Sequence, residues 1–276
     1  MKKIAALFVI IISVIVLGNA SFIIISNEKT KSHINGLKKE IADIEKTEIV
    51  REDELTKLEN ENNELRKELS DDLSDKKIVY LTFDDGPTPE NTRAILDILK
   101  RNNVKATFFV IGQNPNLYKQ IVDEGHSIAL HTYSHVYGKI YASENAFFDD
   151  LYKLKDLVYE KTGVEAKVTR FPGGSSNAIV KKELLRKIID RLNAEGFVYQ
   201  DWNCDSSDAA ASKQKVELLV KNAEMCKMKK INILMHDSKT KTTTVEALQT
   251  IITNYKKEGY SFDKLTVYSP KFQHRK

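Results

Sequence analysis

Cysteine is scarce in this sequence. The 276 residues include only two, Cys204 and Cys226, and this number excludes a multi-disulfide framework. The two are not spaced as a CxxC pair, so a zinc ribbon and a dithiol redox site are excluded as well. We expect Cys204 to be a small buried hydrophobic side chain. A single bridge between the two cysteines is the alternative.

An excess of one charge is also missing. The chain has 43 Lys and Arg against 39 Asp and Glu, and the formal net charge is only +4. Proteins that bind nucleic acid usually concentrate basic residues on one surface, so we expect no nucleic-acid partner. The hydrophobic fraction of 41% is ordinary for a folded protein. The length allows one substantial domain and an appendage.

One long apolar run lies near the N-terminus. Residues 4–25 follow two lysines and are about as long as a bilayer crossing, roughly 20 residues. Residues 18–20 resemble a signal-peptidase site, but the apolar run resumes over residues 22–25. We therefore predict an uncleaved transmembrane anchor at residues 1–26. The basic N-terminus favours a cytoplasmic start, which makes this a single-pass protein of the cell membrane with its remaining chain extracellular.

Residues 27–75 carry a seven-residue apolar repeat, which predicts a helical, coiled-coil type of stalk. Its two seam positions hold Ile34, Ile41, Leu55 and Leu69, and Leu37, Ile44, Leu58 and Leu65. Polar Glu48, Arg51 and Asn62 interrupt the seam, so a homodimer and a single solvated helix both fit. About 40–45 helical residues would reach roughly 60 Å at about 1.5 Å per residue. We interpret the stalk as a spacer.

A domain of α/β class is predicted over residues 76–276. Strand-length apolar runs occur at residues 78–83, 106–111 and 231–235, and helix-like segments at 92–101, 117–124, 146–162 and 181–195. Alternation of strands and helices implies a mainly parallel sheet with crossover helices, either open or closed into a barrel. In such barrels the active-site residues gather at the carboxyl ends of the strands.

Five polar clusters occur in this domain, and several of them fall at the ends of predicted strands. In chain order they are Thr82-Phe83-Asp84-Asp85-Gly86-Pro87, His131-Thr132-Tyr133-Ser134-His135, Arg170-Phe171-Pro172-Gly173-Gly174, Asp201-Trp202-Asn203-Cys204-Asp205 and Leu234-Met235-His236-Asp237. Taken singly, each has a structural explanation, such as a helix cap, a turn or a core histidine. Two histidines four residues apart can nevertheless share one face of a helical turn and meet one metal ion.

Together and in this order, the five clusters resemble those of the polysaccharide deacetylase (NodB homology) family, carbohydrate esterase family 4. The resemblance covers residues 76–268 and leaves out the predicted anchor and stalk. It implies a distorted (β/α) barrel with fewer than eight complete strands. It also implies an enzyme that hydrolyses acetyl groups on glycans with the help of a divalent metal ion.

The resemblance also assigns roles to the residues. Asp85, His131 and His135 would bind the metal, which suits zinc, with cobalt, nickel or iron also compatible. Asp84 would be the general base, oriented by Arg170.

The remaining roles concern the acid and the substrate. His236 would protonate the leaving amine, and Asp205 would hold its ring. The Gly173 backbone N–H would stabilise the developing oxyanion, while Trp202 and Leu234 would form the apolar wall for the acetyl methyl group.

The match departs from the family pattern at two positions near the expected glycan groove. Many relatives carry an aromatic residue where this chain has Gly173, and a tryptophan where it has Ala209. An extracellular site on a stalk suits a cell-wall polymer, so we predict peptidoglycan as the substrate, with N-acetylglucosamine preferred over N-acetylmuramic acid. Alternatives are another acetylated glycan, such as an exopolysaccharide, chitin fragments or xylan, and a catalytically silent barrel that binds glycan.

Overall fold

The computed structural model describes residues 2–275, and in the first helix it describes the side chains at positions 17, 19, 21, 26–62 and 64. The chain divides into two compact units, residues 1–73 and residues 74–276. Each is described here by itself.

The N-terminal unit is one helix. Helix α1 runs without interruption over Lys2–Ser74, so the prediction of helix for the heptad region is confirmed. The seam residues Ile34, Leu37, Ile41, Ile44, Leu55 and Leu58 are all exposed in the single chain. Pairing of two stalks therefore stays a prediction.

No helix qualifies as a membrane span among the residues that the structure describes. Most side chains of the predicted anchor, residues 1–26, lie outside those residues. The anchor, and the membrane localisation that depends on it, therefore also stay predictions.

The second unit is an open barrel of eight parallel strands. The strands are β1 (Ile78–Asp84), β2 (Thr107–Val110), β3 (Ser127–Leu130), β4 (Val168–Thr169), β5 (Val198–Tyr199), β6 (Cys204–Asp205), β7 (Lys230–His236) and β8 (Ser261–Asp263). Their order is β5-β4-β3-β2-β1-β7-β6, and β8 pairs with the first half of β1. Within the described chain, β5 and β6 form no ladder with each other. The predicted distorted (β/α) barrel is confirmed in outline. The structure has eight strands, of which β4, β5 and β6 are only two residues long and β8 lies off the main strand order.

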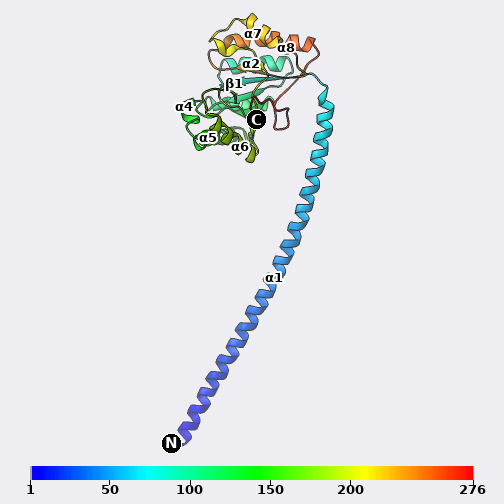
Figure 1. Ribbon diagram of the computed structural model, residues 1–276. Helices are drawn as coiled ribbons and strands as arrows, with labels where there is room; N and C mark the ends of the chain where they lie inside the picture. Colours follow the sequence, from blue (N-terminus) through cyan, green and yellow to red (C-terminus); the bar gives the residue numbers. More distant parts are fainter. Residues whose placement is uncertain (1, 276) are drawn as a thin grey trace. The chain divides into compact units, whose positions relative to one another are not determined.

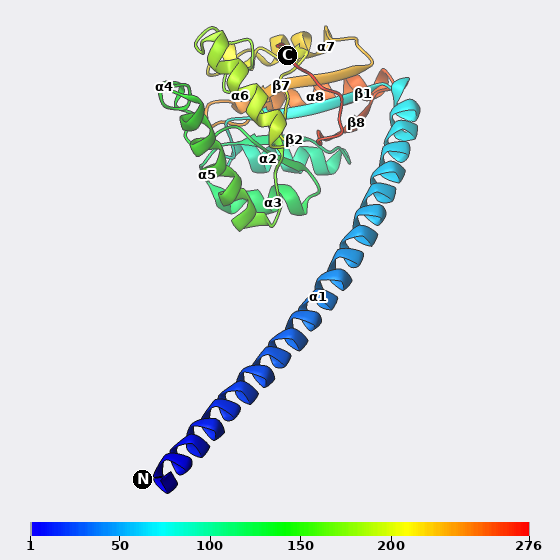
Figure 2. The same ribbon diagram turned by 60° about the horizontal axis from the view of Figure 1, so that its bottom comes forward.

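Helices connect these strands and cover the sheet. They are α2 (Asn91–Arg101), α3 (Tyr118–Asp123), α4 (Tyr137–Ile140), α5 (Glu144–Thr162), α6 (Lys182–Ala194), α7 (Val216–Glu224) and α8 (Thr242–Lys257), with short 3-10 turns η1 (Pro115–Leu117) and η2 (Asp208–Ala210). Helix α8 packs beside α2 and α7, and α5 packs beside α3 and α6. Figures 1 and 2 show the strands of this unit between these two groups of helices.

The central strands are buried because helices lie over them. All seven residues of β1 are buried, as are the middle five of β7, which explains their nearly continuous apolar sequences. Inside the core, the rings of Phe83 and Phe108 stack with centroids 5.2 Å apart. The carboxyl ends of the strands are consequently fixed by a packed interior.

Helix α5 shows how local sequence sets an element's limits. Ser143 caps its start by accepting a hydrogen bond from the Ala146 N–H, and its end falls at Gly163, which adopts φ +73°. Glycine tolerates this left-handed conformation where other residues are strained. The helix begins two residues before the predicted start at Ala146 because the cap lies upstream.

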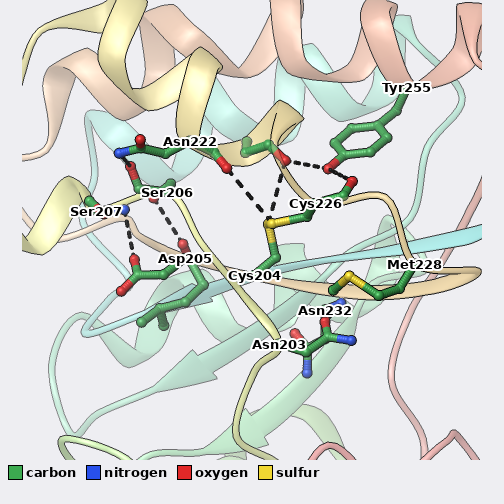
Figure 3. The surroundings of a disulfide bond; sticks show 12 residues. Asn203, Cys204, Asp205, Ser206, Ser207, Asn222, Cys226, Met228, Asn232 and Tyr255 are labelled. Carbon is green, nitrogen blue, oxygen red and sulfur yellow. Dashed lines mark hydrogen bonds between the residues drawn. A yellow bond between two sulfur atoms is a disulfide. The ribbon is translucent and has the colours of Figure 1, made fainter.

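The two cysteines are joined, so the expectation of an unpaired Cys204 is wrong. Cys204 and Cys226 form a disulfide with an S–S distance of 2.09 Å. Figure 3 shows that the bridge links β6 to the segment that follows α7. Sequence spacing alone could not reveal it, because the return of the chain through α7 brings the two positions together.

Candidate active site

The predicted site residues gather where the parallel strands end. Asp84 is the last residue of β1 and His236 the last of β7, and the two are direct neighbours in the strand register. His131 directly follows β3, and Arg170 directly follows β4. Because all these strands run in parallel, their carboxyl ends meet at one side of the barrel.

Asp85, His131 and His135 form a potential metal site. One ligand atom from each lies within 4.8 Å of the other two. The Asp85 Oδ1 atom is 3.2 Å from His135 Nε2 and 3.5 Å from His131 Nε2. This carboxylate oxygen is buried and accepts no hydrogen bond from any residue that the structure describes. An unpartnered buried oxygen facing two imidazole nitrogens fits a cation.

The histidine rings are oriented for such a role. The Nδ1 atom of His131 lies 2.9 Å from the Arg170 carbonyl oxygen, so it donates there and leaves Nε2 free as a ligand. Burial, followed by the neighbouring His131, lowers the pKa of His135. Neutral imidazole is the form that binds metals.

Asp85 is held ionised by its neighbours. Burial opposes a charge on this carboxylate, but its electrostatic interactions with His131, His135 and His236 outweigh it and lower the pKa of Asp85. A charged carboxylate beside neutral imidazoles is the donor set expected for a zinc-like ion.

The backbone at this cluster adopts unusual conformations. Asp85, Thr132 and His135 have φ angles of +71°, +65° and +51°, a region that costs a non-glycine residue of order 1–3 kcal/mol. Hydrogen bonds from surrounding residues retain it, since Gln113 donates to the Asp85 carbonyl and Asp150 accepts from the Ser134 N–H. The fold thus bends both loops so that their side chains converge.

Asp84 is buried against an arginine. Its Oδ1 atom lies 2.7 Å from Arg170 Nη1, and its Oδ2 atom lies 3.7 Å from His131 Nε2. Arg170 is fully buried and also donates to the Gln200 and Asp201 carbonyls. The predicted pairing of Arg170 with Asp84 is present, and it holds the Asp84 carboxylate next to the potential metal site.

His236 pairs with Asp208, not with Asp205 as predicted. The Asp208 Oδ1 atom lies 2.7 Å from His236 Nδ1, and its Oδ2 atom accepts from the His236 N–H and the Thr244 hydroxyl. Asp205 is exposed and accepts from the Ser207 N–H instead (Figure 3). The chain turns back at η2, and this turn carries Asp208 rather than Asp205 to the histidine.

This carboxylate changes the chemistry of His236. Burial disfavours a charged imidazole, but the hydrogen bond and charge of Asp208, helped by Asp84 and Asp85, prevail and raise its pKa to about 9. Its Nε2 atom is 4.0 Å from Asp85 Oδ2. The raised pKa favours the protonated ring of His236 at neutral pH, and the ring lies beside the potential metal site, where it can donate a proton.

The predicted substrate-binding residues lie in different settings. Gly173 is exposed, with φ +77°, and its N–H donates to no residue in the described part of the chain. Trp202 packs against Gly174, where an added Cβ would lie 2.8 Å from the indole ring. Leu234 is buried two positions before His236 on β7, so both point to the same face of the strand.

Asp208 had no role among the residues predicted from the sequence. It lies three residues after Asp205 in the same polar run, and burial distinguishes the two, since Asp208 is only 1% exposed. No local pattern marks that difference. The signal that could have found Asp208 is the presence of a second carboxylate near the end of β6.

Comparisons with known proteins agree with this geometry. The family described as "Polysaccharide deacetylase" matches residues 71–189. The YheN protein of Bacillus subtilis is 34% identical over 279 residues, covering 95% of this chain and 90% of YheN. A peptidoglycan-N-acetylglucosamine deacetylase of Bacillus cereus is 35% identical over 198 residues, covering 68% of this chain and 86% of that enzyme.

A solved structure is similar as well. The catalytic domain of a peptidoglycan N-acetylglucosamine deacetylase from Eubacterium rectale is 39% identical, with a TM-score of 0.68, and the match covers 72% of this chain and 93% of that domain. Sequence, fold and site geometry lead to the same assignment. The chain belongs to the polysaccharide deacetylase family and is a deacetylase that acts as a hydrolase.

Proposed function

We propose that this enzyme removes N-acetyl groups from the N-acetylglucosamine of peptidoglycan with the help of a divalent metal ion. The observation that carries the proposal is that a candidate base and a candidate acid each lie within 4.0 Å of a residue of the potential metal site. Asp84 lies 3.7 Å from His131, and His236 lies 4.0 Å from Asp85. Amide hydrolysis requires these three functions together.

Asp85, His131 and His135 would hold the ion, with zinc as the first candidate and cobalt, nickel or iron as alternatives. When bound, the ion would polarise the acetyl carbonyl and make a water molecule more acidic. With three protein ligands, a position remains open for water and substrate.

The chain's own residues would move the protons. Asp84, fixed by Arg170 at 2.7 Å, would accept a proton from the attacking water. His236 would then donate its Nε2 proton to the departing amine, while Asp208 stabilises the charged ring. The unpartnered Gly173 N–H would donate to the oxyanion that forms on the acetyl group.

The choice of peptidoglycan rests on the relatives and on the predicted location. The enzymes from Bacillus cereus and Eubacterium rectale are named for peptidoglycan N-acetylglucosamine. A predicted anchor at residues 1–26, followed by a helical stalk, would place the domain outside the cell near the wall. The Cys204–Cys226 disulfide supports this location, because disulfides persist in oxidising compartments.

A second glycan is the strongest competing proposal. A bifunctional xylanase/deacetylase of Pseudobutyrivibrio xylanivorans is 34% identical over 193 residues, which is 29% of its length. The site described here would therefore also suit a deacetylase that acts on xylan or on another acetylated polymer. A panel of acetylated glycans distinguishes these substrates by the rate of acetate release.

The test of the proposed function is acetate release from N-acetylated peptidoglycan by zinc-loaded residues 76–276. Wild-type protein should release acetate, and chelation of the metal should abolish release. Asp84→Asn should lower kcat by about 10²–10⁴-fold while zinc still binds, as expected for loss of a general base. His131→Ala should lower zinc affinity itself. Absence of release from zinc-saturated wild type would refute the peptidoglycan assignment.

A further inference from the structure

Tyr137 lies beside the potential metal site formed by Asp85, His131 and His135, and it has no part in the mechanism described above. It begins helix α4, two residues after His135. Its ring meets the His135 ring edge to face, with centroids 5.6 Å apart, and meets the Tyr141 ring at 5.8 Å. The ring is therefore held between a metal ligand and a second aromatic residue.

The Tyr137 hydroxyl occupies the space next to Gly173. A Cβ atom added at Gly173 would lie 2.9 Å from this hydroxyl oxygen and 3.3 Å from a ring carbon. A side chain at position 173 would thus displace the tyrosine. The missing side chain allows a hydroxyl from α4 to reach the loop that follows β4.

This hydroxyl has no hydrogen-bond partner among the residues described. Tyr141, its neighbour on the same side, donates to the Pro172 carbonyl at 2.9 Å, whereas no such bond is made by Tyr137. Nor does the Gly173 N–H donate to any residue in the described part of the chain. Two free donors, one from a side chain and one from the backbone, therefore lie close together next to a metal ligand.

The Tyr137 side chain is half-buried, and a phenol hydroxyl can donate a hydrogen bond. Partly buried donors of this kind gain most from an acceptor that arrives with a ligand.

We propose that Tyr137 binds and positions the substrate, its hydroxyl donating a hydrogen bond to an oxygen of the N-acetylated sugar that lies between His135 and Gly173. The inference rests on the proposed function and adds a specificity-determining residue to it. Tyr137 is a substrate-binding residue. It neither takes up nor releases a proton in the reaction.

The experiment compares Tyr137→Phe with wild type in the full chain, loaded with zinc, using tetra-N-acetylchitotetraose. Loss of one hydrogen bond should raise KM about threefold to tenfold, with a smaller change in kcat. Tyr137→Phe should raise the Kd of the oligosaccharide by the same factor. This Kd is measured by calorimetry in an Asp84→Asn background, where the substrate is not turned over. Tyr159→Phe is the matched control, because Tyr159 is 60% exposed on α5, and it should change neither value.

Three results would overturn the inference. The first is an unchanged KM and Kd in Tyr137→Phe. The second is a fall in zinc affinity equal to the fall in oligosaccharide affinity, which would assign Tyr137 to the support of His135. The third is an equal effect of Tyr141→Phe, which would point to the loop rather than to a direct contact. If wild type releases no acetate from any acetylated glycan, the proposed function fails instead.

Discussion

The proton carried by His236 depends on the carboxylate behind its ring. Asp208 is almost fully buried and contacts the ring nitrogen, the backbone N–H of His236 and the Thr244 hydroxyl. Such a network stabilises the charged imidazole, and the pKa of His236 rises to about 9. A general acid must be protonated to act, so activity should be lost as the pH rises through this pKa.

We therefore expect Asp208→Asn to move the basic limb of the pH–rate profile to lower pH. An amide carries no charge, so burial would then dominate and lower the pKa of the His236 ring. The measurement is kcat/KM for acetate release between about pH 6 and pH 10. Asp205→Asn is the matched control, because the exposed Asp205 carboxylate contacts Ser207 rather than His236. A shifted limb in Asp205→Asn and a fixed one in Asp208→Asn would reverse the assignment.

The lack of a side chain at Gly86 allows the backbone there to pack against the Asp237 carboxylate. A Cβ there would lie 2.1 Å from the carboxylate of Asp237, which is buried and accepts from the Thr92 hydroxyl. Burial, aided by the charges of Asp85 and Asp84 and only partly opposed by the Thr92 hydrogen bond, raises the pKa of Asp237 to about 7. The loop that carries Asp84 and Asp85 can pack this closely only because Gly86 has no side chain.

At the scale of elements, the disulfide joins two parts of the scaffold near His236, the proposed general acid. It connects β6 to the segment after α7, and the loop between them contains η2 with Asp208. Asn222 of α7 also donates to the Ser206 carbonyl in this loop (Figure 3). The position of Asp208 thus depends on the pairing of β6 with β7 and on the anchoring of α7.

Removal of this bridge should lower the free energy of unfolding by about 3 kcal/mol, because the closed loop spans 22 residues and its closure restricts the unfolded chain. Urea unfolding of wild type and of the double variant Cys204→Ser, Cys226→Ser measures the difference. Wild type in excess reductant is the control and should match the double variant. Equal midpoints for oxidised and reduced wild type would show that the bridge is absent or contributes nothing.

At the scale of the whole molecule, the chain consists of two units that divide near residue 73. The site lies entirely within the second unit, and all its hydrogen bonds named above are internal to that unit. We therefore expect residues 76–276 to retain the kcat/KM of the full chain on a soluble oligosaccharide. A loss of more than about tenfold would mean that the stalk contributes to the site.

The proposed anchor gives a separate prediction for the full chain in cells. It should sediment with membranes, resist extraction by high salt and dissolve in detergent, because an apolar helix is held by the bilayer core rather than by charge. Cell fractionation followed by mass spectrometry of the intact protein tests this. A mature chain that begins directly after Ala20 would indicate a cleaved signal and contradict the anchor.

The sequence by itself determined the class of fold and most of the candidate site. Apolar runs located β1, β2 and β7, since a buried parallel strand must be apolar on both faces. The polar clusters at the strand ends contained Asp84, Asp85, His131 and His236, because each cluster is contiguous in the chain and all strands end on one side.

Tertiary structure decided the contacts that join distant segments. The choice of Asp208 over Asp205, the Cys204–Cys226 bridge and the approach of Tyr137 to Gly173 all depend on where the chain turns back. Two aspartates three residues apart look alike in a sequence, and only packing determines which one is buried. Short-range patterns record the periodicity of elements, whereas such pairings are fixed by the packing of the whole domain.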